Sequence, residues 1–151
     1  MGLALQEAKA AFKKDEVPIG AVIVHQGKVV GKGHNQTESL KDATAHAEIL
    51  AIGSASDFLK SWRLESCSIY VTVEPCIMCA GAIVLSRIKR LVFGAYDIKN
   101  GACGSLYDIV SDKRLNHQVE ITSGILETEC VELIQSFFKK VRTKDDSKPT
   151  H

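Results

Sequence analysis

The spacing of apolar residues changes along the chain between the period of a helix and that of a strand. From residue 3 to residue 12, apolar side chains recur every three or four positions, which predicts an amphipathic helix. Two apolar runs, 19–24 and 29–33, flank the turn residues Gln26 and Gly27, and such a pair predicts an antiparallel β-hairpin. The chain is therefore expected to open with a helix followed by a hairpin.

A polar stretch and a second helix are expected next. Residues 35–42 are polar, and the apolar pattern resumes over 45–52, which predicts a helix. Asp42 or Thr44 would serve as its N-cap, because their side-chain oxygens can accept a hydrogen bond from the first free backbone N–H groups.

A strand and a third helix follow without a loop between them. Residues 67–73 alternate β-branched and aromatic side chains, which favours a strand. This strand leads directly into Pro75, and proline suits the first turn of the helix expected over 76–86.

The last part of the chain decides the sheet type. Residues 90–93 and 119–121 are predicted strands, and 127–141 is a predicted amphipathic helix. The long connection between the two strands, which includes residues 106–110, favours a parallel pair, because a hairpin needs only a few residues and a parallel crossover needs a dozen or more, usually helical. We therefore predict an α/β fold with a mixed five-stranded sheet whose last two strands are parallel.

Length indicates a single domain. The 151 residues can bury one core, and no apolar run approaches the ~20 residues that span a bilayer. The polar end of the chain, with Pro149, is expected to fray from Thr143 onward. We assign residues 1–143 to the domain and 144–151 to a flexible tail, and we expect a cytoplasmic protein without a membrane contact.

Composition narrows the possible functions only slightly. Apolar residues make up 45% and charged residues 25% of the chain, which excludes a disordered protein. The net charge of +1 gives no global argument for nucleic acid, so any RNA contact must come from local patches. Five cysteines form an odd set, which favours reduced thiols or metal ligation over a disulfide framework.

One imidazole and two thiols stand at predicted helix starts. Cys76 and Cys79 are three positions apart, so on a helix both sulfurs lie on one face and can share a metal with His46. The positive end of a helix also favours thiolates. Zinc suits this donor set, and three protein ligands leave one tetrahedral position open, which is typical of a catalytic zinc rather than a structural one.

Glu48 supplies a carboxylate beside these ligands. It lies two residues after His46, which on a helix turns it roughly 200° away from the imidazole and makes it a poor ligand on the same face. A carboxylate next to a zinc-bound hydroxide can instead shuttle protons between water, a ring nitrogen and a departing amine. Taken alone, Glu48 would be an ordinary solvated helix residue.

Two alternative interpretations of these residues remain open. A lone Cys-x-x-Cys can be a redox pair, although a thioredoxin-like motif does not require a His-x-Glu helix start elsewhere. A purely structural zinc site would need a fourth ligand. The possible fourth ligands are His25, His34, His117, Cys67, Cys103 and Cys130.

The sequence resembles the bacterial tRNA-specific adenosine deaminases of the cytidine-deaminase-like superfamily. The resemblance covers nearly the whole chain and rests on the segments 16–22, 33–35, 45–48, 73–82, 93–95 and 104–106. The zinc motifs fit the entire superfamily, whereas the continuation over 78–82 and the segment 94–106 look more like the tRNA branch. The resemblance implies a three-layer α/β/α fold and hydrolytic deamination of adenosine to inosine at the wobble position of a tRNA anticodon.

The resemblance also implies roles for individual residues. His46, Cys76 and Cys79 would hold one Zn²⁺ per subunit, and Glu48 would shuttle protons. Asn35 would hydrogen-bond the target base, and Val17 and Pro18 would form part of the wall of its pocket. Asp97 would contact the neighbouring nucleotide. The residues expected to contact the anticodon stem-loop are Phe138, Lys139, Lys140 and Arg142. The family is homodimeric, and the apolar helix over 76–85 is a candidate interface.

Two rival functions share parts of this pattern. An enzyme acting on a free base or nucleoside such as cytosine, guanine or cytidine would have the same zinc site with a different pocket, and the expected parallel crossover argues only against the free-cytidine type. A zinc-stabilised RNA-binding module without catalysis would need four protein ligands.

Overall fold

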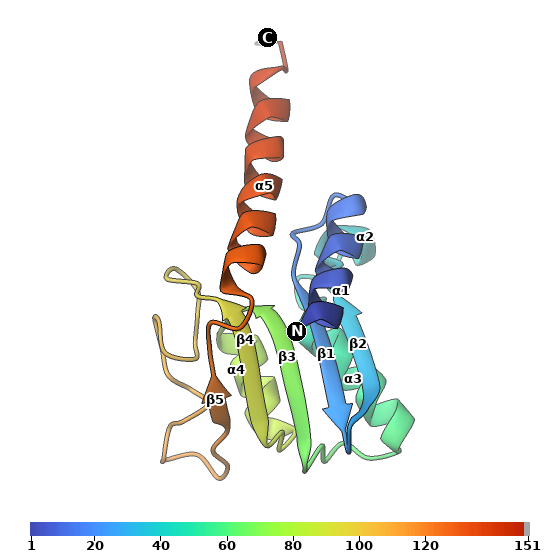
Figure 1. The fold of residues 1–151 in the computed structure, drawn as a ribbon, viewed down its shortest axis with the longest axis vertical. Coiled ribbons are helices and arrows are strands. Elements are labelled where there is room, and N and C mark those ends of the chain that lie inside the picture. Colours follow the sequence, from blue (N-terminus) through green and yellow to red (C-terminus); the bar gives the residue numbers. More distant parts are fainter. Residues whose placement is uncertain (150–151) are drawn as a thin grey trace.

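The hairpin at one edge of the sheet begins the architecture (Figure 1). In the computed structural model, which describes residues 1–149, strands β1 (Gly20–His25) and β2 (Lys28–His34) pair antiparallel, as predicted. Gln26 and Gly27 both have positive φ, 50° and 74°, which is the conformation of the tight turns that join such strands. The sheet then continues in the order β2-β1-β3-β4-β5.

Strand direction changes once across the sheet. β3 (Cys67–Val73) is antiparallel to β1 and parallel to β4 (Arg90–Ala95), and β5 (Glu120–Thr122) is parallel to β4. The predicted mixed sheet with parallel last strands is confirmed. The long connection predicted between the last two strands is present over residues 96–119, all of them described, and it contains no helix, although parallel crossovers usually do.

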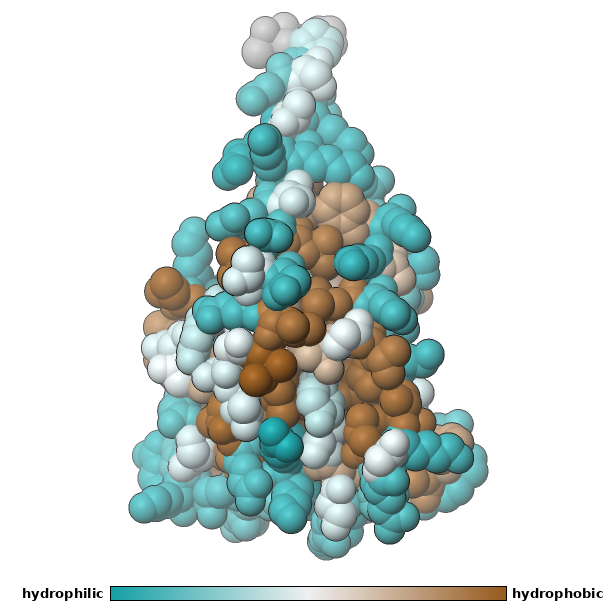
Figure 2. All heavy atoms as spheres, in the orientation of Figure 1, coloured by the Kyte–Doolittle hydropathy of each residue, from teal (hydrophilic) through white to brown (hydrophobic). Residues whose placement is uncertain are grey.

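Helices cover both faces of the sheet. Helices α1 (Gly2–Lys13) and α5 (Glu127–Asp146) lie on the face toward the viewer in Figure 1, and α3 (Ala47–Leu59) and α4 (Ile77–Leu85) lie on the face behind. The expected three-layer α/β/α fold is therefore confirmed. The end of α5 stands clear of the sheet and is polar, whereas apolar side chains gather between α1 and the start of α5 (Figure 2).

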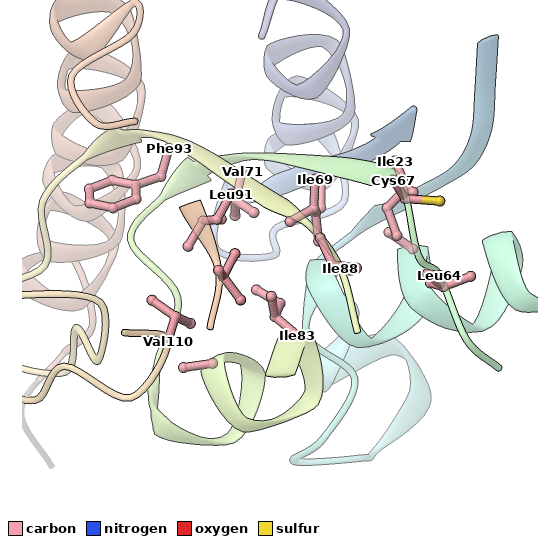
Figure 3. Packing of buried hydrophobic residues seen from close by; sticks show 14 of the residues in the cluster. Ile23, Leu64, Cys67, Ile69, Val71, Ile83, Ile88, Leu91, Phe93 and Val110 are labelled. Carbon is pink, nitrogen blue, oxygen red and sulfur yellow. The ribbon is translucent and has the colours of Figure 1, made fainter. Parts of the chain in front are cut away.

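The main core lies between the sheet and the rear helices. Ile69, Val71 and Leu91 point from the strands toward Ile83 of α4, and Val110 of the crossover closes the cluster from the side (Figure 3). A smaller cluster on the opposite face joins α1 and α5 to the sheet. It consists of Leu5, Val73, Ala95 and Cys130.

Contact between β2 and α3 is unusually close, and it fixes where α3 begins. A Cβ built on Gly33 would lie 2.4 Å from the Ala47 carbonyl oxygen and 2.8 Å from the Ala51 nitrogen. Only glycine leaves room for this approach, so the first turn of α3 lies directly against the strand.

The region before α3 differs from the sequence-based expectation. A short helix, α2 (Thr37–Leu40), interrupts the polar stretch. The N-cap of α3 is His46 rather than Asp42 or Thr44, because the Asp42 carboxylate instead accepts hydrogen bonds from the backbone N–H and hydroxyl of Thr44, at 2.8 and 2.7 Å. Helix α3 also continues to Leu59, seven residues beyond the predicted end.

Two other element ends also differ. Cys76 is the N-cap of α4, so Pro75 precedes the helix instead of standing in its first turn. Helix α5 runs to Asp146, so the predicted boundary between residues 143 and 144 falls inside it. Residues 150–151 of the predicted tail lie outside the described residues.

Within residues 1–149, none of the helices combines the length and the apolar character that a membrane crossing requires.

Candidate metal centre and active-site cleft

Two helix starts meet and bring three metal-binding side chains together. His46 is the N-cap of α3, Cys76 is the N-cap of α4, and Cys79 lies in the first turn of α4. The His46 Nδ1 atom is 3.6 Å from the Cys76 Sγ atom and 3.5 Å from the Cys79 Sγ atom. All three donor atoms lie within 4.8 Å of one another.

These distances fit a zinc ion. Zn–S bonds of about 2.3 Å and Zn–N bonds of about 2.0 Å at a tetrahedral angle place sulfur and nitrogen about 3.5 Å apart. Within the described part of the chain, no fourth histidine, cysteine or carboxylate joins the group. The donor set therefore matches a three-ligand site and does not supply the closed four-ligand site of a structural zinc.

The protonation of the group favours a thiolate at Cys76. Hydrogen bonds from the Cys79 thiol and the His46 ring lower the pKa of Cys76 to about 4. The pKa of Cys79 rises because its thiol is hydrogen-bonded to Cys76 and because it is buried. The hydrogen bond with Cys76 likewise raises the pKa of His46. Cys76 is thus the first of the two thiols to offer the thiolate that metals bind.

Glu48 occupies the wall beside this group. It is the second residue of α3, its side chain lines the cleft, and only 4% of the residue is exposed. Burial raises the pKa of its carboxyl above the usual value. A carboxyl whose pKa is moved toward neutrality can both take up and release a proton at working pH, which is the requirement for a general acid–base residue.

A large open cleft connects the metal group with α5. Its volume is about 1570 Å³. The residues proposed from sequence that line it are Val17, Asn35, His46, Glu48, Cys76, Asp97, Phe138, Lys139 and Arg142. Cys79 is fully buried within the metal group, and Pro18 is buried next to Val17. Ile19 also lines the cleft. Lys140 forms an ion pair with Asp15 at 3.0 Å.

Asn35 presents an unused polar atom to the cleft. Its backbone N–H donates to the Ile19 carbonyl at 3.1 Å, which fixes the residue at the end of β2. Its side-chain Oδ1 atom is buried and has no hydrogen-bond partner among the described residues. Because buried polar atoms are nearly always paired, this atom indicates a place where a ligand supplies the missing partner.

Several cleft residues had not been identified from the sequence. Tyr96, Lys99 and Asn100 follow the end of β4, and Glu74 follows the end of β3. The Tyr96 ring is held in place, with its hydroxyl 2.6 Å from the Ser123 hydroxyl and its ring edge-to-face with Phe93. Their position after the predicted parallel strands could have identified them, because ligands of α/β proteins bind beyond the carboxyl ends of such strands.

Comparisons with known proteins identify the family of this chain. Residues 1–142 match the MafB19-like deaminase family. A tRNA-specific adenosine deaminase of Bacillus subtilis is 49% identical over 141 residues, 93% of this chain and 88% of the relative. A tRNA-specific adenosine deaminase of Aquifex aeolicus is 51% identical over 140 residues, 93% of this chain and 92% of the relative.

The fold also has a solved counterpart. A structure from a study of A-to-I editing by tRNA:A34 deaminases at the wobble position of transfer RNA matches with a TM-score of 0.85 and 47% identity, covering 88% of this chain and 96% of that chain. Both the sequence and the fold therefore place the chain in one family. The chain belongs to the bacterial tRNA-specific adenosine deaminases of the cytidine-deaminase-like superfamily.

Proposed function

We propose that the protein hydrolyses adenosine to inosine at the wobble position of a tRNA anticodon. One observation carries this proposal: the buried Glu48 carboxyl and the His46–Cys76–Cys79 group share the cleft with the unpaired Oδ1 atom of Asn35. Relatives named tRNA-specific adenosine deaminase at 44–51% identity support the choice of substrate.

One Zn²⁺ per subunit is held by His46, Cys76 and Cys79 in this proposal. When bound, the ion supplies a Lewis acid that makes water a nucleophile near neutral pH. The protein favours binding of the ion because it holds the three donor atoms at suitable distances and lowers the pKa of the Cys76 thiol.

Glu48 moves the protons. Its carboxylate takes one proton from the attacking water and delivers it to N1 of adenine as oxygen adds to C6. It then carries the remaining hydroxyl proton to the exocyclic amine, the C6–N bond breaks, and ammonia leaves. Adenosine and water thus become inosine and ammonia, and Glu48 returns to its initial state.

Asn35 and the apolar wall hold the base during these steps. The side-chain amide of Asn35 pairs with the polar edge of the purine, which satisfies its buried Oδ1 atom. Val17 and Ile19 contact the ring faces from the wall of the cleft. These contacts orient C6 toward the metal group and exclude water from the far side.

The wall formed by α5 faces the rest of the RNA. Phe138, Lys139 and Arg142 line the same cleft as the metal group, and Asp97 lines it from the crossover. Anticodon loops present partly splayed bases, and extruding one into a pocket costs only a few kcal/mol. The cationic side chains along α5 therefore suffice to bind the RNA loop, although the net charge of the chain is only +1.

We further propose that the enzyme is a cytoplasmic homodimer. Helix α4 exposes Ile77 and Leu85 at 56% and 69%, and an apolar helix face of this kind suits a contact with a second copy. Analytical ultracentrifugation of a Leu85→Asp variant beside a Leu3→Asp control on α1 tests this, because only the former should become monomeric.

The substrate is tested by offering alternatives in parallel. Zinc-loaded protein is incubated with an anticodon stem-loop that carries a wobble adenosine, and separately with free adenosine, cytidine, cytosine and guanine. Mass spectrometry of the digested RNA and of the free compounds then identifies every product. Inosine from the stem-loop alone supports the proposal, and turnover of a free base or nucleoside without RNA editing overturns it.

The role of Glu48 has its own test. A Glu48→Ala variant should keep one zinc per chain by elemental analysis and lose turnover of the stem-loop, whereas Glu120→Ala, an exposed glutamate on β5, should behave as the unmodified protein. If the Glu48→Ala enzyme is active, Glu48 is not the proton carrier.

A further inference from the structure

A second buried carboxylate lies at the edge of the metal group, and the proposed chemistry does not use it. Glu74 stands between β3 and the metal ligand Cys76, and it is 3% exposed. Its Oε1 atom accepts hydrogen bonds from the Asp97 N–H at 3.2 Å and the Ser105 hydroxyl at 2.5 Å. Its Oε2 atom accepts from the Cys103 N–H and the Ser105 N–H, both at 3.1 Å.

All four donors belong to the crossover segment 97–105, which folds around the carboxylate. The Ala102 N–H donates to the Pro75 carbonyl at 2.8 Å, and Gly101 pairs with Cys76 in an isolated β-bridge. A Cβ on Gly101 would lie 2.3 Å from the Glu74 carboxylate, so glycine leaves the space that the carboxylate fills. The segment has no helix or strand of its own, and Glu74 is the acceptor at its centre.

A carboxylate suits this position better than any other side chain. It only accepts hydrogen bonds and offers about four lone-pair positions, which equals the number of donors around Glu74. A glutamine of the same shape would turn an N–H group toward N–H donors and leave at least one backbone N–H unpaired.

The segment that Glu74 holds carries part of the cleft wall. Asp97, Lys99 and Asn100 line the cleft. The Asp97 carboxylate accepts hydrogen bonds from the N–H groups of Lys99 and Asn100 at 3.2 and 3.1 Å, so this turn is fixed relative to Asp97. Asp97 is fixed in turn by its N–H group, which donates to Glu74.

We propose that Glu74 is a positioning residue that presents residues 97–100 to the RNA loop and joins this wall to the metal-bearing start of α4. The inference rests on the proposed function for its consequence in catalysis. The hold on the segment is a property of the chain itself and can be measured without substrate.

The test compares Glu74→Gln with the unmodified zinc-loaded protein. Amide exchange measured by NMR should become at least about tenfold faster at Asp97, Cys103 and Ser105 and stay unchanged in the central strands. Zinc content should remain one per chain. For the anticodon stem-loop, KM should rise about tenfold while kcat changes less than about threefold, because saturating RNA restores the position of the segment. The exposed Glu120→Gln variant is the matched control and should show neither effect.

Several outcomes would overturn the proposal. Unchanged exchange at the three amides would do so, as would an unchanged KM despite faster exchange. Loss of zinc together with faster exchange throughout the chain would reduce Glu74 to a structural residue.

If Glu74→Gln does not fold, Ser105→Ala decides, because it removes only one of the four donors. It should then raise KM about threefold, and an unchanged KM counts against the proposal. Absence of editing by the unmodified protein would overturn the proposed function instead, and the exchange measurement would still test Glu74.

Discussion

At the scale of single residues, Asn35 combines a cost to the fold with a proposed role in binding the base. Its Oδ1 atom is buried without a partner, and such an atom costs about 1–3 kcal/mol relative to one that is hydrogen-bonded. The residue lies in the wall of an open cleft, so its removal leaves no sealed cavity. Stability and activity should therefore respond in opposite directions when it is replaced.

We predict that Asn35→Ala keeps or raises the free energy of unfolding and lowers kcat/KM for the stem-loop about 10- to 100-fold, the effect of one or two lost hydrogen bonds. Urea unfolding and steady-state kinetics measure the two quantities. Asn116→Ala, an exposed asparagine in the crossover, serves as the control and should change neither. A marked loss of stability in Asn35→Ala would mean that the side chain supports the fold rather than the substrate.

The sequence predicts some of these residues far better than others. Cys76 and Cys79 were predicted from their spacing, and His46 from the His-x-Glu pattern at a helix start, because the chemistry of a metal donor set depends on side-chain type and helical position. Tyr96 and Lys99 could not be found in this way. The only signal for them is their place after the end of a parallel strand. Lys99 reaches the cleft because the crossover folds around Glu74, and Tyr96 because its ring contacts Phe93 and its hydroxyl contacts Ser123; neither arrangement has a local sequence pattern.

At the scale of elements, the contact between β2 and α3 controls the position of the metal group. We predict that Gly33→Ala lowers the free energy of unfolding by about 1–3 kcal/mol, because the added methyl group meets the backbone of α3. Gly53→Ala on the exposed side of α3 meets no atom within 4 Å and should raise it by about 0.5–1 kcal/mol through helix propensity. Equal effects of the two substitutions in urea unfolding would contradict the close contact.

Helix α5 supplies a second prediction, on where the domain ends. A chain that stops at residue 143 should keep its unfolding midpoint and its kcat/KM, because Phe138, Lys139 and Arg142 remain and the lost Lys144–Asp15 pair is solvent-exposed.

A chain that stops at residue 136 is the matched comparison. It loses Phe137, which is buried and packs edge-to-face on Phe12 with 5.9 Å between ring centroids. It should lose about 3 kcal/mol or more of stability and most of its activity on the stem-loop. Full activity of this shorter chain would show that the part of α5 after residue 136 is not part of the proposed RNA-binding surface.

Element types were predicted well from the chain, and element ends less well, for a reason that α3 illustrates. Gly53 and Ser54 weaken the local helical pattern after Ile52, so sequence periodicity ends there. In the fold, Ala51 and Ala55 pack against the glycines of β2, and this tertiary contact carries the helix to Leu59. In the crossover, by contrast, a helix that parallel connections usually contain is absent, and hydrogen bonds to Glu74 hold the segment in its place.

At the scale of the whole molecule, the metal group connects segments that are distant in sequence. His46 and Cys79 are 33 residues apart, and they join the starts of α3 and α4 on the same side of the sheet. An ion bound by these residues would bind the folded chain far more tightly than the unfolded chain, because the unfolded chain does not hold the three donors together. Zinc should therefore stabilise the whole domain and not only the site.

We predict that removing zinc with a chelator lowers the thermal unfolding midpoint and that adding zinc restores it. The stabilisation should reach about 4 kcal/mol when free zinc is a thousandfold above its dissociation constant, since it grows with the logarithm of that ratio. Differential scanning calorimetry at several zinc concentrations measures this dependence. Cys76→Ser removes one thiolate and should make the midpoint insensitive to both chelator and zinc. If the midpoint of the unmodified protein does not follow zinc concentration, the donor set does not bind the ion in the folded state, and the mechanism built on His46, Cys76 and Cys79 loses its basis.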